Sequence, residues 1–291
     1  MRETGPVHED WVEAAVAGTD HEVTGPPVLH RSRPWADVYR VPTRGEPLWL
    51  KVMRPQVAFE AGVYEVFARV RPGGVLLPVA VDRGRGLLLL PHAEPLRPVD
   101  LAAVLPVYAE LQRALVPHVG ALLATGVEDM RAEVMPRRFA EARERIGTTP
   151  ELDALEPAYA RWCEELADSP VPASLDHNDL HDNNFINGIN GINGTAGPAF
   201  YDWGDSVVAH PFASLLWPLV FLAPDHPRRA RAAYLEAFTD LAPRARLERD
   251  ADLALKVSRV ARALVWLRAV GDSGLHGDAP ARTLRSVLDE R

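Results

Sequence analysis

The chain has 291 residues, 47% of them hydrophobic and 25% charged, which predicts an ordinary globular protein with one large or two smaller domains. Its net charge of -8 argues against nucleic acid as a partner, because proteins that neutralise phosphates usually carry a basic face. Cys163, the single cysteine, excludes an internal disulfide and fits a reducing compartment. The acidic N-terminus lacks signal-peptide features, and the longest apolar run, Leu215 to Ala223, is too short to cross a membrane; both favour a cytoplasmic protein.

The first 94 residues are predicted to form a small β-rich lobe. Residues 22–52 alternate and are rich in strand formers, which indicates a meander of three antiparallel strands with Lys51 near the end of the third. Apolar residues recur at helical spacing over 57–70, so this segment is expected to form an amphipathic helix carrying Glu60 and Glu65. The expected strands are 26–32, 36–42, 47–53, 75–82 and 86–92.

The rest of the chain, residues 95–291, is predicted to form a larger helical lobe that contains one short hairpin. Its strand-like runs are 173–175, 185–186 and 199–201. A small β-rich lobe followed by a helical lobe indicates an α+β fold. The expected helices are 101–115, 133–146, 152–168, 210–222, 228–241, 250–270 and 280–289.

The stretch from Leu175 to Ser206 carries the most informative polar residues. His177, Asp179 and Asn184 precede a turn-rich insert, and Asp202 follows a short apolar run. Two carboxylates and an amide at strand ends suit Mg²⁺, which usually binds one or two carboxylates while substrate phosphates and water complete its coordination. The insert from Asn187 to Pro198 repeats Asn-Gly-Ile and is expected to extend from the surface.

Lys51 stands out because the chain has only two lysines, the other being Lys256. A compact ammonium group contacts phosphate differently from a planar guanidinium, so a lysine kept among arginines is a candidate phosphate ligand.

These residues together resemble the aminoglycoside phosphotransferase and choline kinase family, which has a bilobal, protein-kinase-like fold. The ordered combination carries the resemblance: His177-Asn178-Asp179, Asn184 five residues after the acid, a hairpin, and Asp202-Trp203. Single parts of this pattern are common, whereas the whole order is specific.

The resemblance implies a role for each matched residue. Asp179 would orient and deprotonate the attacking hydroxyl, while Asn184 and Asp202 would hold Mg²⁺ on the phosphates of ATP or GTP. Lys51 would contact the α and β phosphates and form an ion pair with Glu60, with Glu65 as the alternative partner. His177 would brace the loop through its ring.

The resemblance also places the nucleotide base against the link between the lobes, where the Pro91 carbonyl and the Ala93 amide would meet its edge. The phosphate-loop segment, residues 31–41, contains no glycine, so close backbone approach to phosphate is not expected there. Trp35, with Arg31 or Arg33, is expected to cover the nucleotide instead.

Several residues beside Asp179, the expected catalytic base, depart from the family pattern. Asn178 replaces a glycine, and Asp182-Asn183 replaces Pro-Gly, so the acceptor pocket is expected to have its own shape. Asn178 and Asp182 are therefore candidate substrate contacts. Asp205 either binds substrate or caps the next helix.

The predicted function is transfer of a nucleotide γ-phosphate to a hydroxyl of a small molecule, first of all an aminoglycoside or another antibiotic, in resistance or self-protection. The acidic charge suits a cationic acceptor, and a choline-like or sugar metabolite is the second class. Alternatives are an inactive nucleotide-binding module and a zinc hydrolase using His177 and His181, although no further cluster of zinc ligands is evident. A protein-kinase role is disfavoured because helix-like sequence resumes by Phe212. No obligatory protein partner is evident.

Overall fold

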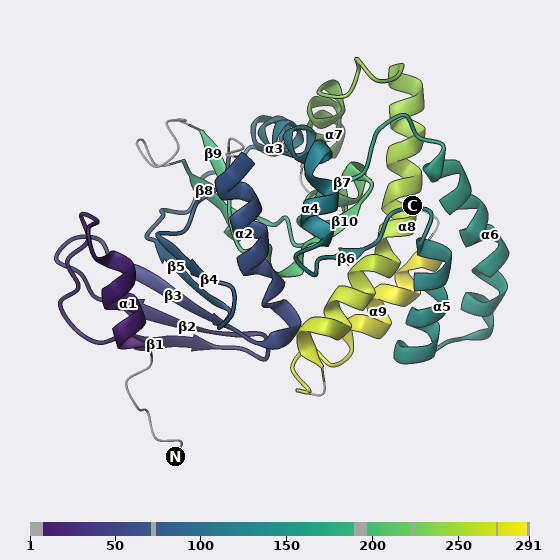
Figure 1. The fold of residues 1–291 in the computed structure, drawn as a ribbon. Helices are drawn as coiled ribbons and strands as arrows, with labels where there is room; N and C mark the ends of the chain where they lie inside the picture. Colours follow the sequence, from purple (N-terminus) through teal and green to yellow (C-terminus); the bar gives the residue numbers. More distant parts are fainter. Residues whose placement is uncertain (1–7, 71–73, 189–196, 223–224, 272, 290–291) are drawn as a thin grey trace.

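The computed structural model describes residues 8–70, 74–188, 197–222, 225–271 and 273–289 (Figure 1). A five-stranded antiparallel sheet lies at one end of the molecule, and most helices lie at the other (Figure 1). Its strand order is β1-β2-β3-β5-β4. The strands are β1 (Val28–Ser32), β2 (Ala36–Val41), β3 (Leu48–Met53), β4 (Ala80–Asp82) and β5 (Leu87–Pro91).

Alternation along the central strands divides their side chains between the two faces of the sheet. Leu87 and Leu89 of β5 pack with Val12 of helix α1 (Glu9–Val16), whereas Leu88 belongs to the core that contains helix α2 (Phe59–Val70). The same period of two applies to β3, where Leu48 and Leu50 join the α1 cluster. Lys51 therefore projects from the face on which α2 lies.

The helical part surrounds one long helix, α8, which packs against α5, α6 and α9. Buried residues occur along most of its length, so it forms the centre of this part of the molecule (Figure 1). The helices are α3 (Leu101–Leu115), α4 (Val119–Leu123), α5 (Met135–Ile146), α6 (Pro150–Ala167), α7 (Pro227–Glu236), α8 (Arg244–Val270) and α9 (Ala279–Arg285). Short 3-10 helices cover Pro55–Val57, Val116–His118, Asp182–Asn184, Trp203–Asp205, Pro211–Leu215 and Ser286–Leu288.

Two small sheets flank the loop from His177 to Asn184, which follows strand β7 (Ser174–Asp176). Strands β8 (Phe185–Asn187) and β9 (Pro198–Phe200) form the expected hairpin, and the insert residues 189–196 between them lie outside the described residues. A three-stranded sheet, in the order β6-β10-β7, joins β6 (Glu128–Asp129), β10 (Val207–Ala209) and β7. Sequence periodicity did not predict β6 or β10, because strands of two or three residues are too short to show a period.

The expected helix over residues 210–222 is wrong in type. The chain forms a 3-10 helix at Pro211–Leu215 followed by a π-helix at Leu216–Phe221. Pro218 has no backbone N–H to donate, so a regular α-helical ladder is interrupted within this segment. The other differences are smaller: α1 was not predicted, α8 begins at Arg244, and the strand expected from residue 75 is regular only from Ala80.

None of the helices in the described part of the chain is both long and apolar enough to cross a membrane.

Candidate active site

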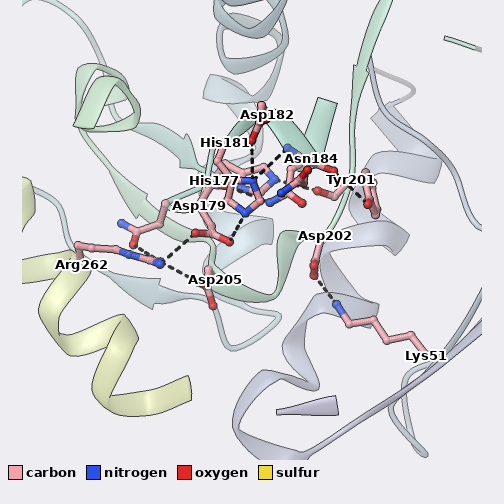
Figure 2. Close-up of polar contacts among 12 residues, drawn as sticks. Lys51, His177, Asp179, His181, Asp182, Asn184, Tyr201, Asp202, Asp205 and Arg262 are labelled. Carbon is pink, nitrogen blue, oxygen red and sulfur yellow. Dashed lines mark hydrogen bonds and ion pairs between the residues drawn. The ribbon is translucent and has the colours of Figure 1, made fainter. Parts of the chain in front are cut away.

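Lys51 lies between two carboxylates that come from distant parts of the chain. Its Nζ atom is 2.6 Å from Glu60 Oε2, in the first turn of α2. It is also 2.6 Å from Asp202 Oδ1, beyond the β8–β9 hairpin (Figure 2). The other Glu60 oxygen accepts a hydrogen bond of 3.0 Å from the Trp203 backbone N–H. Of the two glutamates considered, the structure brings Glu60 to Lys51, whereas Glu65 lies 3.9 Å from Arg83.

Lys51 attracts both carboxylates, but the carboxylates repel each other: burial and the Asp202 charge outweigh Lys51 and raise the pKa of Glu60 to about 7. Burial alone lowers the pKa of Lys51, but the adjacent Asp202 and Glu60 carboxylates outweigh it and raise the pKa above the usual lysine range. Burial acts in the opposite sense on Asp202, where the Lys51 ammonium overcomes it and lowers the pKa of the carboxyl. Lys51 is therefore cationic and Asp202 anionic near neutral pH.

The backbone around Asp202 is unusually constrained. Asp202 adopts φ 65°, in the left-handed region that aspartate tolerates better than most residues. Gly204 follows it closely: a Cβ atom at this position would lie 3.2 Å from Glu60 Oε2. The absence of a side chain at Gly204 lets this segment approach the ion pair.

Asp176 shapes the loop that follows β7. Its buried carboxylate accepts hydrogen bonds from the Asn178 backbone N–H at 2.9 Å, from Asn178 Nδ2 at 3.2 Å and from Ser214 Oγ at 2.6 Å. These bonds hold Asn178 at φ 61°. The sequence analysis did not predict a role for Asp176. Its only sequence signal is its position directly after the strand-like residues 173–175. The amide nitrogen of Asn178 turns toward Asp176, and its Oδ1 atom lies 3.4 Å from Arg262 Nη1; its contact with substrate stays a prediction.

His177 contacts the backbone of Tyr201, directly after β9. Its Nε2 atom lies 2.9 Å from the Tyr201 carbonyl, and its ring packs against Trp203 at a centroid distance of 4.6 Å. Since a carbonyl oxygen can only accept, Nε2 is the protonated nitrogen of the ring. Burial lowers the pKa of His177, so the ring is neutral at physiological pH.

Asp179 and Asn184 are joined through the loop backbone. Asn184 Nδ2 donates a hydrogen bond of 2.8 Å to the Asp179 backbone carbonyl, so the amide oxygen of Asn184 is the atom that could serve as a metal ligand. The Asp179 carboxylate lies 3.3 Å from His181 Nε2 and 2.9 Å from Arg262 Nη2 (Figure 2). Burial raises the pKa of Asp179, but Arg262 and His181 outweigh this effect and lower it to about 2. Asp179 is therefore ionised.

Arg262 is a component of the site that the sequence reading missed. It projects from α8 and bridges Asp179 and Asp205, with Nη1 2.7 Å from Asp205 Oδ2 (Figure 2). Nothing in the sequence distinguished it from the other arginines of this helix. The partner of Asp205 is thus an arginine, and the expectation that Asp205 caps the next helix is wrong, since His210 caps it.

Asp182 also has an arginine partner. Its Oδ2 atom lies 3.5 Å from Arg97 Nη2, and its backbone carbonyl accepts a hydrogen bond of 2.8 Å from Arg97 Nη1. The carboxylate is half-exposed at the edge of the loop. Asp182 therefore lies near Asp179, with its carboxylate in contact with Arg97.

A cavity of about 360 Å³ opens beside Lys51 and Asp202. Its walls are mainly apolar and aromatic, as in most small-molecule sites. The expected covering residues Arg31, Arg33 and Trp35 line it, and so do Pro91 and Ala93 of the link between the lobes. Its other lining residues are His30, Ala36, Val38, Trp49, Leu76, Leu90, His92, Pro95, Ile186 and Tyr201.

The donor set suits Mg²⁺ better than zinc. Across the described residues, no group of three or more His, Cys, Asp or Glu side chains is arranged to hold a metal ion. His177 is bound to the Tyr201 carbonyl, and His181 contacts Asp179. One carboxylate from Asp202 and one amide oxygen from Asn184 are the kind of sparse oxygen set that Mg²⁺ uses when substrate phosphates supply further ligands.

A family model described as the phosphotransferase enzyme family matches residues 35–249, which include strands β2 to β5, most residues that line the cavity, and the loop from His177 to Asn184. The chain belongs to this phosphotransferase family. It is therefore a phosphotransferase, as the order of Lys51, Asp179, Asn184 and Asp202 had predicted. No curated protein matches the chain.

The fold is also shared with solved phosphotransferase structures. A macrolide 2'-phosphotransferase type I has a TM-score of 0.61 at 15% identity, with 99% of each chain covered. The GDP complex of an aminoglycoside 2'-phosphotransferase has a TM-score of 0.59 at 15% identity, covering 97% of this phosphotransferase and 98% of that chain. A choline kinase from Streptococcus pneumoniae has a TM-score of 0.65 at 13% identity, with coverages of 96% and 97%. The predicted bilobal, protein-kinase-like α+β fold is thus confirmed; its division at residue 94 stays a prediction.

Proposed function

We propose that this phosphotransferase transfers the γ-phosphate of ATP or GTP to a hydroxyl group of a small molecule. The observation that carries the proposal is the ion pair between Lys51 and Asp202, which joins the sheet to the catalytic-loop region at the wall of the cavity. The cation and the carboxylate suit the phosphates of a magnesium nucleotide. The apolar cavity beside them suits the nucleotide base. The GDP complex of a related fold supports a nucleotide as co-substrate.

The nucleotide is assigned to the cavity between the sheet and Tyr201. Lys51 contacts the α and β phosphates, and Glu60 holds the lysine in place through its buried ion pair. The base lies against the segment Pro91–Ala93, with the Pro91 carbonyl and the Ala93 amide as its polar contacts. Trp35 and the arginines before it cover the nucleotide in place of a glycine-rich loop.

The chemistry is assigned to Asp179, on the other side of the triad. Asp179 orients the acceptor hydroxyl and receives its proton as the oxygen forms a bond to the γ-phosphorus, while the bond from this phosphorus to the bridging oxygen breaks and a nucleoside diphosphate leaves. Asn184 and Asp202 would hold Mg²⁺, which would neutralise charge on the phosphates. His177 braces the loop through the Tyr201 carbonyl.

The first acceptor class to test is an antibiotic, in line with the fold shared with macrolide and aminoglycoside phosphotransferases. A choline-like or sugar metabolite is the second class, which the similarity to a choline kinase supports. The chain is assigned to the cytoplasm, where ATP, GTP and Mg²⁺ are present.

The experiment is a panel of hydroxylated antibiotics and metabolites assayed for magnesium-dependent consumption of ATP and of GTP. The expected result is a product heavier by one phosphoryl group, identified by mass spectrometry and absent when Mg²⁺ is chelated. Magnesium-dependent nucleotide binding without turnover of any acceptor would instead favour an inactive nucleotide-binding module.

A further inference from the structure

Arg262 occupies the side of the site that faces away from the nucleotide cavity, since neither it nor Asp179 lines that cavity. Its guanidinium lies between two carboxylates and two aromatic rings. The guanidinium carbon is 4.6 Å from the ring centroid of Trp266 and 5.4 Å from that of Trp217. Its two terminal nitrogens contact the Asp179 and Asp205 carboxylates and Asn178 Oδ1, whereas its buried Nε has no hydrogen-bond partner.

These partners are the groups that would recognise a positively charged acceptor. Ammonium groups are bound by carboxylates, and quaternary ammonium groups by aromatic faces. Both kinds of group are present beside Asp179, and the protein's own guanidinium already fills the space between them. The third nearby carboxylate, Asp182, is bound to Arg97.

Displacing Arg262 would be costly. Its side chain is only 1% exposed, and a guanidinium pushed out of contact with its carboxylates would stay in a poorly solvated position. Asp179 differs, because 23% of its side chain is exposed. A hydroxyl group can therefore reach the base while Arg262 stays in place, whereas an ammonium group has no unpaired carboxylate to meet at this point.

We infer that Arg262 takes the place of an acceptor cation, and that the acceptor is uncharged around its reacting hydroxyl. This inference rests on the proposed function and narrows it. Neutral sugars and uncharged, hydroxylated antibiotics fit the site, whereas polyamino sugars and choline-like compounds do not. The acidic net charge of the chain gives no support to a cationic acceptor here, because Asp205 and Asp182, the acids beside Asp179 on this side, each contact an arginine.

The first test compares acceptors that differ in charge but present the same hydroxyl groups. The pairs are kanamycin with its fully N-acetylated form, choline with 3,3-dimethylbutan-1-ol, and glucosamine with N-acetylglucosamine. The neutral member of a pair is expected to have a kcat/KM at least about tenfold higher, equivalent to one favourable contact in the acceptor site. Faster phosphorylation of the cationic members would overturn the inference and leave the proposed function intact.

The second test does not depend on turnover. Arg262→Met removes the guanidinium and leaves its two carboxylates and two aromatic rings in place. Isothermal titration with tetramethylammonium and with kanamycin is expected to show affinity for the variant at least about tenfold above that of the wild type. Equal binding by the two proteins, or tight binding by the wild type, would overturn the inference even if the acceptor panel gave no product.

Arg259→Met is the matched control on the same helix. Arg259 is also buried, but its guanidinium contacts the Ser286 carbonyl and Asp289, away from the catalytic loop. This variant is expected to bind both cations as weakly as the wild type. If Arg262→Met does not fold, Arg262→Gln retains a donor to one carboxylate and is tested in its place; if neither variant folds, binding by the wild type alone decides, since tight binding overturns the inference and its absence supports it.

Discussion

At Asp179 the carboxylate faces the Arg262 guanidinium and Nε2 of the His181 ring, whose Nδ1 accepts a hydrogen bond from the Asn183 backbone N–H. The low pKa of Asp179 makes it a weak proton acceptor. Its larger contribution is to hold the acceptor hydroxyl in line with the γ-phosphate, with the proton transferred late in the reaction. The same carboxylate also fixes Arg262, so one residue links the reacting hydroxyl to the charge of the acceptor site.

Asp179→Asn is therefore expected to abolish phosphoryl transfer, lowering kcat by about 10²- to 10⁴-fold, as loss of a positioned base usually does. The nucleotide affinity is expected to stay within a few-fold, because Asp179 does not line the cavity. Steady-state kinetics and nucleotide titration measure the two effects separately. Asp240→Asn, which removes an exposed carboxylate bound to Arg113, is the control with normal activity. Retained turnover in Asp179→Asn would contradict its assignment as the base.

The environment of Lys51 predicts that its loss affects both the stability of the protein and its nucleotide kinetics. Lys51→Ala leaves the Glu60 and Asp202 carboxylates without their shared cation, so the variant is expected to lose roughly 3–5 kcal/mol of unfolding free energy. It is also expected to raise the nucleotide KM or lower kcat. Denaturant unfolding and kinetics at varied nucleotide concentration measure these changes.

The second lysine provides the matched control. Lys256 lies with its ammonium 5.0 Å from the centroid of the Trp162 ring, far in sequence and structure from the triad. Lys256→Ala is expected to cost about 1 kcal/mol or less and to leave the kinetics unchanged. Equal effects of the two substitutions would show that Lys51 has no special part in nucleotide binding.

At the level of the elements, helix α2 carries Glu60 and must approach the helical lobe closely. Gly62 lies in this helix, and a Cβ atom at that position would be 2.8 Å from Thr125 Cβ, just after α4. A contact this short requires the two segments to separate. Because Glu60 lies two residues earlier, such a shift also moves the partner of Lys51.

Gly62→Ala is therefore expected to destabilise the protein by about 1–3 kcal/mol, although alanine is the better helix former by about 1 kcal/mol. Gly120→Ala in α4 is the control: the added Cβ meets nothing within 4 Å, so this variant is expected to be neutral or slightly more stable. Thermal or denaturant unfolding compares the two. A stabilised Gly62→Ala variant would show that α2 and the segment after α4 are less tightly packed than the distance indicates.

The elements also show what local sequence can and cannot predict. Strands β2 and β3 and helix α3 follow clear periodicity and begin and end within a few residues of the expected bounds. The site residues from Asp179 to Asp202 were predicted from their fixed spacing and the family resemblance, and their roles stay a prediction. Arg262 was not, because it reaches the loop from α8, and a contact between residues so distant in the chain leaves no local pattern. The 3-10 and π turns near Pro218 were missed because an apolar run does not reveal its hydrogen-bond register.

At the scale of the whole molecule, few polar contacts connect the sheet with the helical lobe around the cavity. The ion pair from Lys51 to Asp202 is one, and backbone hydrogen bonds join the segment at Glu94–Leu96 to β8, at Asn187 and Phe185. A nucleotide in the cavity would contact both sides at once. Its binding free energy would therefore add to the cohesion of the two lobes in the folded state and not in the unfolded chain.

Saturating nucleotide with Mg²⁺ is thus expected to raise the unfolding temperature. At about 100 times Kd the gain is about 2.7 kcal/mol, which corresponds to a shift of roughly 4–5 °C in a chain of this size. Differential scanning fluorimetry with ATP and with GTP, each with and without Mg²⁺, also identifies the preferred nucleotide. Asp202→Asn is the control expected to lose the magnesium-dependent part of the shift, because it removes the carboxylate assigned to the metal. A wild-type protein that neither nucleotide stabilises would contradict the assignment of this cavity.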